Sequence, residues 1–451
     1  MTRHAMALRD RTHASCDEFK GRIMLTSRER VAIALSHQEP DRVPLDLGGC
    51  GQTGMHVDAV YRLRQALGLD EPGTPVKVIE PYQMLGEIKP DLVDALGVDV
   101  VPLSGGPTLF GFRNEGWKPW TTFGGTPVLV PGGFNTVPEP NGDILMYPEG
   151  DKSVPPSGVM PQGGFYFDSL MRQPPIDEAH LNVQDNVEEF GPIADRDLTH
   201  FAAEAQRLYT ETDKAIFAVF PGSGFGDIAL VPAMWLKHPK GIRDVEEWYV
   251  STVTRQDYVY AIFERQCEIA LQNMERFYHA VGDRVMLVHI TGTDFGTQTA
   301  PFISPKTYQK LYQPFHRRLN DWIHTHTEWK SFMHTDGAIM PLLPHFADAG
   351  FDILNPVQFT ATGMDPATVK GKFGDRFTFW GAGVDTQQVL PFGTPDEVRA
   401  QVRENIRIFS PGGGFVFSTV HNAQPQTPVQ NLIAMYDTVR EFGEYANHGE
   451  R

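Results

Sequence analysis

Short apolar runs alternate with longer amphipathic segments along most of this chain. The apolar runs predict β-strands at residues 43–47, 98–103, 215–220, 285–290, 330–333, 351–354, 377–380 and 415–420. Helical periodicity follows at 56–67, 91–96, 193–210, 256–281, 305–324, 338–349, near 366, 395–409 and 428–442, and a first short helix begins at Thr26 or Ser27. Apolar strands that are each followed by a helix are typical of a buried parallel sheet. About eight such units predict a (β/α)8 barrel of the TIM type.

One stretch interrupts this alternation. Residues 105–175 are rich in Gly and Pro, carry several aromatic residues, and contain an Asn141-Gly142 pair typical of a hairpin turn. We expect a β-rich insertion there, in the N-terminal half of a single barrel domain that spans residues 26–445. The aromatic side chains could cover a flat ligand, although core packing or a subunit contact would explain them equally well. Residues 1–25 are polar and aperiodic, and we expect them to be a mobile extension.

Composition and charge narrow the class of function. The chain has 451 residues, of which 41% are hydrophobic, and a formal net charge of −17. This balance argues against a basic surface for nucleic acid or anionic membranes, so a small-molecule substrate is expected. The three cysteines are too few and too scattered for a disulfide framework or a cysteine-rich metal site. No apolar segment has the length of a membrane span or a secretion signal, which predicts a cytoplasmic protein, and a homodimer is compatible with it.

Polar residues gather immediately after the predicted strands. The carboxyl ends of barrel strands lie on one rim, where the active sites of such barrels are built. An active site is therefore expected at this rim. The candidate residues are Asp294, Gln298, His334, Asp336, Asn355, Gln358, Asp385, Gln387, His421, Asn422 and Gln424. Three other histidines lie on or after a polar helix and are expected at the surface: His316, His324 and His326.

Three of the rim residues form a candidate metal site. His334 and Asp336 are two positions apart, so on extended backbone their side chains point to the same side. If the strands that precede Asp336 and His421 are neighbours, His421 supplies a third ligand and leaves a position open for substrate, as in catalytic zinc sites. A His-x-Asp pair by itself is weak support, because most such histidines form ordinary hydrogen bonds. The position of this pair at a strand end favours a metal site over an ordinary hydrogen bond.

Several segments resemble the uroporphyrinogen decarboxylase superfamily, which includes the decarboxylase of haem biosynthesis and cobalamin-linked methyltransferases. The resemblance lies in residues 294–314 with the helix start Ile303-Ser304-Pro305, in the turn at His334, and in the tail His421-Asn422-Ala423-Gln424-Pro425-Gln426-Thr427-Pro428 followed by Asn431. It covers the chain from about residue 26 to the C-terminus, apart from the insertion. It implies the same barrel fold.

The methyltransferase branch implies a particular set of metal ligands. Its zinc is held by a His-x-Cys turn and by a Cys six residues before the Thr of a Thr-Pro pair. Here His334 matches the first ligand, Asp336 stands in place of the first Cys, and His421, six residues before Thr427, stands in place of the second. The resemblance thus implies a divalent metal, with zinc the first choice, on a harder set of donors that suits an oxygen-containing substrate.

The haem-pathway branch fits less well. It binds the carboxylates of its tetrapyrrole with an arginine-rich turn after the first strand, whereas residues 47–58 of this chain contain no Arg. We therefore expect a methyltransferase closer to the cobalamin-dependent branch, moving a methyl group between a small O-methyl substrate and a corrinoid that is carried by a separate protein or is free cobalamin. The alternatives are a decarboxylase or other lyase acting on a small carboxylic acid, and a non-catalytic barrel that only binds.

Roles follow from this expectation. Asp294 is a candidate general acid or base, or a substrate ligand, and a simple loop cap is an equal alternative. The remaining rim residues are expected to bind the substrate or to orient the metal ligands. They are Gln298, Asn355, Gln358, Asp385, Gln387, Asn422 and Gln424.

Overall fold

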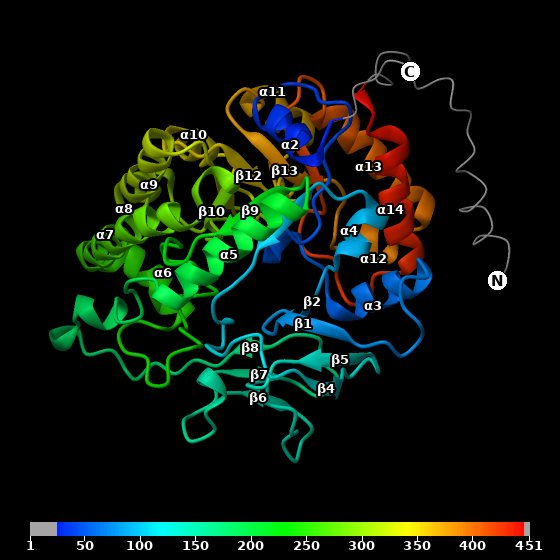
Figure 1. Ribbon diagram of the computed structural model, residues 1–451. Coiled ribbons are helices and arrows are strands. Elements are labelled where there is room, and N and C mark those ends of the chain that lie inside the picture. The colour runs from blue at the N-terminus through cyan, green and yellow to red at the C-terminus, as the bar shows by residue number, and fades with distance from the viewer. Residues whose placement is uncertain (1–24, 446–451) are drawn as a thin grey trace, which may run out of the picture.

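The computed structural model of the protein describes residues 25–445 and contains a curled sheet of seven strands (Figure 1). Every pair of neighbouring strands in it is parallel. In spatial order the strands are β14 (Phe415–Ser418), β13 (Thr378–Ala382), β12 (Ile353–Asn355), β11 (Lys330–His334), β10 (Leu287–Thr291), β9 (Ala215–Val219) and β3 (Val100–Leu103). The expected N-terminal extension lies outside the described residues, except for residue 25.

The segment 43–47 connects the two edges of this sheet. Leu45 forms a parallel bridge with Phe417 of β14, and the Asp46 N–H donates to the Phe417 carbonyl at 2.9 Å. On its other side, the Leu45 carbonyl accepts from the Asp99 N–H at 2.8 Å, immediately before β3. Segment 43–47 therefore fills the eighth strand position and closes the sheet, which confirms the predicted TIM-type barrel.

Helices return the chain between the strands and cover the outside of the barrel (Figure 1). They are α3 (Val57–Ala66), α4 (Pro90–Leu96), α5 (Asp195–Glu211), α6 (Val245–Thr254), α7 (Gln256–Val281), α8 (Pro305–Leu311), α9 (Gln313–His326), α10 (Leu343–Asp348), α11 (Pro366–Phe373), α12 (Val389–Phe392), α13 (Pro395–Phe409) and α14 (Val429–Phe442). Most match the helices expected from periodicity, but α6 and α12 were not predicted. None of the helices within residues 25–445 is both long and apolar enough to cross a membrane.

Aromatic side chains fill the inside of the barrel. The ring centroid of Phe217 lies 4.7 Å from that of Phe332 and 5.7 Å from that of Trp380. Helix α2 (Ser27–Leu35), which starts at a Thr26 capping box, adds Val31 and Ala34 to this buried cluster at the amino ends of the strands. Because this end is packed shut, a ligand can reach the barrel only at the opposite, carboxyl rim.

The region expected to be an insertion is β-rich and belongs to two small sheets beside the barrel (Figure 1). The first contains β6 (Ile144–Met146), β7 (Gly158–Met160) and β8 (Asp168–Ser169). In the second, β4 (Lys118–Thr121) and β5 (Pro127–Val130) join β1 (Val76–Glu80) and β2 (Leu85–Gly86), which precede β3 in the chain. The β-rich part of the molecule is therefore broader than residues 105–175.

The prediction for His316 was wrong. Its side chain is fully buried, and its ring packs near Phe225 and Phe351. Its Nδ1 is hydrogen-bonded to the Tyr308 hydroxyl at 2.9 Å, and burial lowers the pKa of His316 to about 3. His324 and His326 are exposed, as expected.

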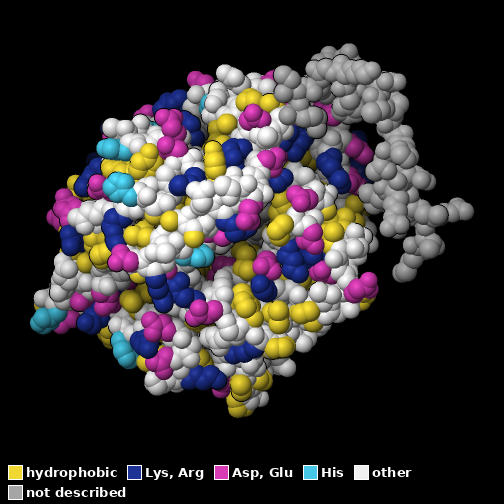
Figure 2. Space-filling view, viewed as in Figure 1, with side chains coloured by type: hydrophobic (Ala, Val, Ile, Leu, Met, Phe, Trp, Pro, Cys, Tyr) yellow, Lys and Arg dark blue, Asp and Glu magenta, His cyan; other side chains and the backbone are white. Residues whose placement is uncertain are grey.

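Charges of both signs are mixed on the face seen in Figure 2, where Lys and Arg side chains lie among Asp and Glu side chains. No broad basic area covers this face of the described residues.

Candidate metal centre and active-site pocket

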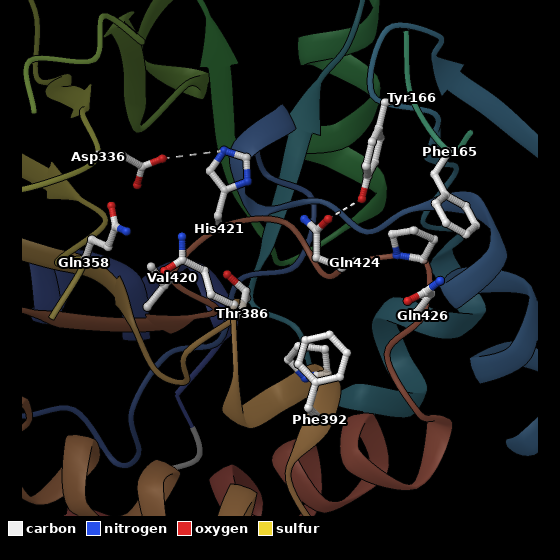
Figure 3. A pocket seen from close by; sticks show the side chains of 13 residues that line it. Phe165, Tyr166, Asp336, Gln358, Thr386, Phe392, Val420, His421, Gln424 and Gln426 are labelled. Atoms are coloured by element: carbon white, nitrogen blue, oxygen red, sulfur yellow. Dashed lines mark hydrogen bonds and ion pairs between the residues drawn. The ribbon is translucent and has the colours of Figure 1, made fainter. Parts of the chain in front are cut away.

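The three side chains expected to bind a metal come together at the carboxyl rim. His334 is the last residue of β11, Asp336 lies in the loop after it, and His421 lies in the loop after β14. One ligand atom from each lies within 4.8 Å of the other two. The Asp336 Oδ2 is 3.7 Å from the His334 Nε2. It is 3.9 Å from the His421 Nε2 (Figure 3). The two strands are not neighbours, since β12 and β13 separate them, and it is the curvature of the sheet that brings their ends together.

Asn355 fixes the orientation of the His334 ring. The Asn355 amide nitrogen donates to the Trp380 carbonyl at 2.6 Å, which turns the amide oxygen toward His334. That oxygen lies 2.6 Å from the His334 Nδ1 and accepts its proton. The proton of the neutral ring therefore stays on Nδ1, and the Nε2 lone pair faces Asp336. An outer hydrogen bond of this kind is the usual support of a metal-binding histidine.

Asp294 lies at the edge of the same group. Its Oδ1 accepts the backbone N–H of Asp336 at 2.8 Å and lies 3.9 Å from the His334 Nε2. Burial raises the pKa of Asp294, and the nearby His334 opposes that rise. Asp294 thus shapes the loop that carries Asp336 and also places a carboxyl group beside the three candidate ligands.

The arrangement fits a divalent metal ion. Two imidazole nitrogens and one carboxylate are common zinc ligands, and they leave a fourth position open for substrate. The Asp336 Oδ1 is buried without a hydrogen-bond partner among the described residues, as expected of a carboxylate meant for a cation. Ligand atoms on a tetrahedral zinc lie about 3.4 Å apart, so the distances of 3.7 and 3.9 Å from Asp336 need a small inward movement, and the two imidazoles, whose ligand atoms lie within 4.8 Å, must also move toward each other.

A pocket of about 530 Å³ opens beside this group. It is lined by Phe165, Tyr166, Asp336, Gln358, Thr386, Gln387, Pro391, Phe392, Val420, His421, Gln424, Pro425 and Gln426 (Figure 3). Three of the amides expected at the site, Gln358, Gln387 and Gln424, are among them. The Gln358 side-chain oxygen also accepts the Gly337 N–H at 2.7 Å and so holds the turn after Asp336.

Other expected residues lie elsewhere. Gln298 is exposed and does not line this pocket. The carboxylate of Asp385 is buried and accepts the backbone N–H groups of Gln387, Gln388 and Val389, so it caps its own turn. Asn422 donates to the Gln83 side chain and accepts from Gln424, behind the pocket wall.

Sequence reasoning missed Phe392 and Gln426. Phe392 stands in a Pro-Phe-Gly turn at the end of α12, without the periodicity that marks a core residue. Phe165 and Tyr166 belong to the aromatic residues of the insertion, for which a ligand-covering role was one alternative. Only the folded arrangement shows that these two rings reach the pocket.

A second polar group, also missed, lies at the rim. Asp227 follows a Gly-rich loop after β9, and burial raises its pKa to about 6. Burial lowers the pKa of His289 to about 3. A Cβ atom on Gly292 would lie 3.1 Å from the Gln52 Nε2 and 3.2 Å from the Asp227 Oδ2, so a larger residue there would require these two side chains to shift by a few tenths of an ångström.

Comparison with known proteins places the fold and the site in context. The family model described as uroporphyrinogen decarboxylase (URO-D) matches residues 172–442, more than half of the chain. The protein belongs to the URO-D family. All three candidate metal ligands lie within the part that matches the URO-D family.

Individual relatives are distant. A uroporphyrinogen decarboxylase from Methylococcus capsulatus (strain ATCC 33009 / NCIMB 11132 / Bath) is 29% identical over 100 residues, which make up 22% of this chain. The match spans 27% of that curated relative, so the chain covers about a quarter of its length. Among solved structures, a methyltransferase from Methanosarcina mazei aligns with a TM-score of 0.52 and 15% identity, covering 93% of this chain and 99% of that one. At this identity the likeness shows a shared fold and no more.

Proposed function

We propose that this URO-D family protein is a metal-dependent methyltransferase that moves a methyl group from a small O-methyl compound to a corrinoid on a separate protein or to free cobalamin. The observation that carries the proposal is the convergence of His334, Asp336 and His421 beside a pocket at the barrel rim. This set has no thiolate and presents nitrogen and oxygen donors, which suit the activation of an oxygen-bound methyl group.

Each residue of the site has its own proposed role. A divalent metal held by His334, Asp336 and His421 would act as a Lewis acid toward the ether oxygen of the substrate. Asn355 keeps the His334 Nε2 free to bind by holding the proton on Nδ1. A cob(I)alamin co-substrate would supply the electron pair and accept the methyl group as the carbon–oxygen bond breaks, and the Asp294 carboxyl would give its proton to the departing oxygen.

A decarboxylase of a small acid is the second candidate, because both the family and the Methylococcus relative are described as uroporphyrinogen decarboxylases. The residues that line the pocket argue against a decarboxylase. No Lys or Arg is among the described residues that line the pocket, whereas Asp336 adds a carboxylate to it. A substrate carboxylate would lack a cationic partner there unless it bound the metal itself.

Methyl transfer can be tested on the full-length protein loaded with zinc. Cob(I)alamin is mixed with the protein and a panel of methoxylated compounds, and the visible spectrum is followed. We expect conversion to the spectrum of methylcobalamin with at least one compound. A cobalt spectrum that stays unchanged with the whole panel, together with release of CO₂ from a small carboxylic acid, would replace the proposal by the decarboxylase.

Metal content tests the ligand set and the non-catalytic alternative. We expect close to one equivalent of metal in protein purified without chelators, and loss of that metal in Asp336→Ala. Asp94→Ala is the control, since the Asp94 side chain is 75% exposed and lies on α4. A wild-type protein without bound metal would favour a non-catalytic barrel, and full metal content in Asp336→Ala would remove Asp336 from the ligand set.

A further inference from the structure

The pocket beside the metal centre has an unusual lining for a site so close to charged groups. Apart from the candidate ligands Asp336 and His421, every residue that lines it is an uncharged amide, hydroxyl or apolar side chain. Its volume of about 530 Å³ lies in the range of pockets that enclose a small organic molecule. The lining therefore suits a neutral ligand of more than a few atoms.

Three aromatic rings border the pocket and come from two separate parts of the chain. Phe165 and Tyr166 come from the β-rich region beside the barrel, and Phe392 comes from α12 at the barrel rim (Figure 3). The Phe392 side chain is 70% exposed, although it is large and apolar. A phenylalanine left open at the mouth of a pocket gains burial when an apolar ligand covers it.

The wall formed by Phe165 and Tyr166 is held in place from behind. The Tyr166 hydroxyl donates to the Gln424 side-chain oxygen, and the Gln424 amide nitrogen donates to the Asn422 side chain at 2.9 Å. The His56 Nε2 is hydrogen-bonded to the Phe165 carbonyl at 3.1 Å, and its ring packs edge-on against both aromatic rings. A wall that is already fixed loses little freedom when a ligand binds to it.

We propose that Phe165, Tyr166 and Phe392 form an aromatic clamp that binds the ring of an uncharged aromatic methyl ether. The ring would lie among these side chains, and its methoxy group would reach Asp336 and His421. The orientation of the methoxy group rests on the proposed function, whereas the clamp rests on the lining alone. Offset or edge-on contacts among aromatic rings favour a planar ring over an aliphatic chain of similar size.

Binding is measured apart from catalysis, on the full-length protein freed of metal and without cobalamin, so that a carboxylate probe cannot bind the metal. The probes are methoxybenzene, methanol and 4-methoxybenzoate, and dissociation constants come from ligand-observed NMR titration. We expect methoxybenzene to bind most tightly and 4-methoxybenzoate to bind less well, because no cationic side chain lines the pocket. Phe392→Ala should weaken methoxybenzene about 10-fold, which corresponds to about 1.4 kcal/mol.

A matched variant separates this effect from a general loss of surface apolar area. Val253 on α6 is 72% exposed and does not line the pocket, so Val253→Ala should leave binding unchanged. Phe165→Ala should reproduce the effect of Phe392→Ala. Equal affinity of Phe392→Ala and Val253→Ala for methoxybenzene, or tighter binding of 4-methoxybenzoate than of methoxybenzene, would overturn the clamp.

The two proposals fail in different ways. If methoxybenzene binds through the clamp but no methoxylated compound methylates cob(I)alamin, the clamp stands and the methyltransferase proposal fails. If methanol methylates cob(I)alamin while methoxybenzene does not bind, the methyltransferase proposal stands and the clamp is wrong.

Discussion

Asn355 sets the orientation of the His334 imidazole, so replacing Asn355 should change the affinity of the protein for the metal. Asn355→Ala deletes the acceptor of the His334 Nδ1 proton, so the ring can rotate or change tautomer. We expect metal affinity to fall 10- to 100-fold, as is typical for the loss of such an outer partner. Competition with a coloured chelator measures the change.

The control for Asn355 is another buried asparagine. Asn431 is 2% exposed, and its amide nitrogen donates to the Leu390 and Gly393 carbonyls. Asn431→Ala should lower stability without weakening metal binding in the folded protein. Equal metal affinities in wild type and Asn355→Ala would mean that Asn355 does not orient a ligand.

The burial of His316 predicts that the stability of the fold changes with pH, whatever the function of the protein is. Its pKa is about 3 in the folded protein and near 6.5 when unfolded, so below pH 6.5 the unfolded state binds a proton that the folded state does not. Its contribution is therefore lost as the pH falls from about 6.5 toward 3. Between pH 7 and pH 5 the wild type should lose about 2 kcal/mol more than His316→Gln in urea unfolding, at 1.36 kcal/mol per pH unit below 6.5. Identical losses in the two proteins would show that His316 is protonated when folded.

What the sequence could predict at this scale depends on how local the signal is. His334 and Asp336 stand next to a strand end, so their shared direction follows from backbone geometry alone. The burial of His316 depends on Phe225 and Phe351, which lie far away in the chain. They cover a face of α9 that the local sequence suggests is polar. The same limit hid Asp227 and Phe392, whose roles depend on what surrounds them in space.

At the scale of elements, the link between the β-rich region and the loop after β14 can be loosened on its own. Tyr166→Phe removes the hydroxyl that donates to Gln424 and keeps the ring. A single hydrogen bond contributes about 1 kcal/mol, so the midpoint of global unfolding should change little. Amide hydrogen exchange should quicken at residues 421–427 and around residue 166, because this contact joins the two segments.

Tyr209→Phe provides the comparison for that experiment. Its ring is 43% exposed on α5, where it stacks against Arg28. It should leave exchange at residues 421–427 unchanged. Unchanged exchange in Tyr166→Phe as well would show that packing, and not the hydrogen bond, holds the wall of the pocket.

The elements that were predicted and those that were missed differ in their surroundings. Strands such as β11 and β14 are buried on both faces, so they appear in the sequence as continuous apolar runs. Strand β1 mixes Val with Lys and Glu and is stabilised by pairing with β5, which lies about fifty residues further along the chain. A pattern within β1 alone cannot show that β5 is its partner. For the same reason the β-rich region extends beyond the Gly- and Pro-rich stretch that revealed it.

At the scale of the whole molecule, one buried carboxylate joins the parts of the chain that meet where the barrel closes. Asp99 is fully buried, and it accepts hydrogen bonds from Arg30 at 2.7 Å, from Arg42 at 2.7 and 2.9 Å, and from the Leu45 N–H at 2.9 Å. It thereby joins α2, the first strand segment and the start of β3. These are the parts of the chain that turn an open sheet into a closed barrel.

Removing Asp99 should therefore destabilise the fold far more than removing a surface ion pair. Asp99→Ala removes the buried acceptor of Arg30, Arg42 and the Leu45 N–H. Arg30 keeps its ion pair with Asp41 at 2.7 Å, so we expect a cost of about 3 kcal/mol, the lower end of the range for breaking a buried pair. Glu204→Ala, which deletes an exposed pair with Arg207 on α5, should change stability by about 0.5 kcal/mol or less. Urea unfolding of both variants measures the difference. Because Asp99 lies at the amino ends of the strands, the fraction of Asp99→Ala that stays folded should bind metal as tightly as the wild type. If Asp99→Ala and Glu204→Ala lost the same small amount of stability, the barrel would have to be closed by backbone pairing and core packing alone.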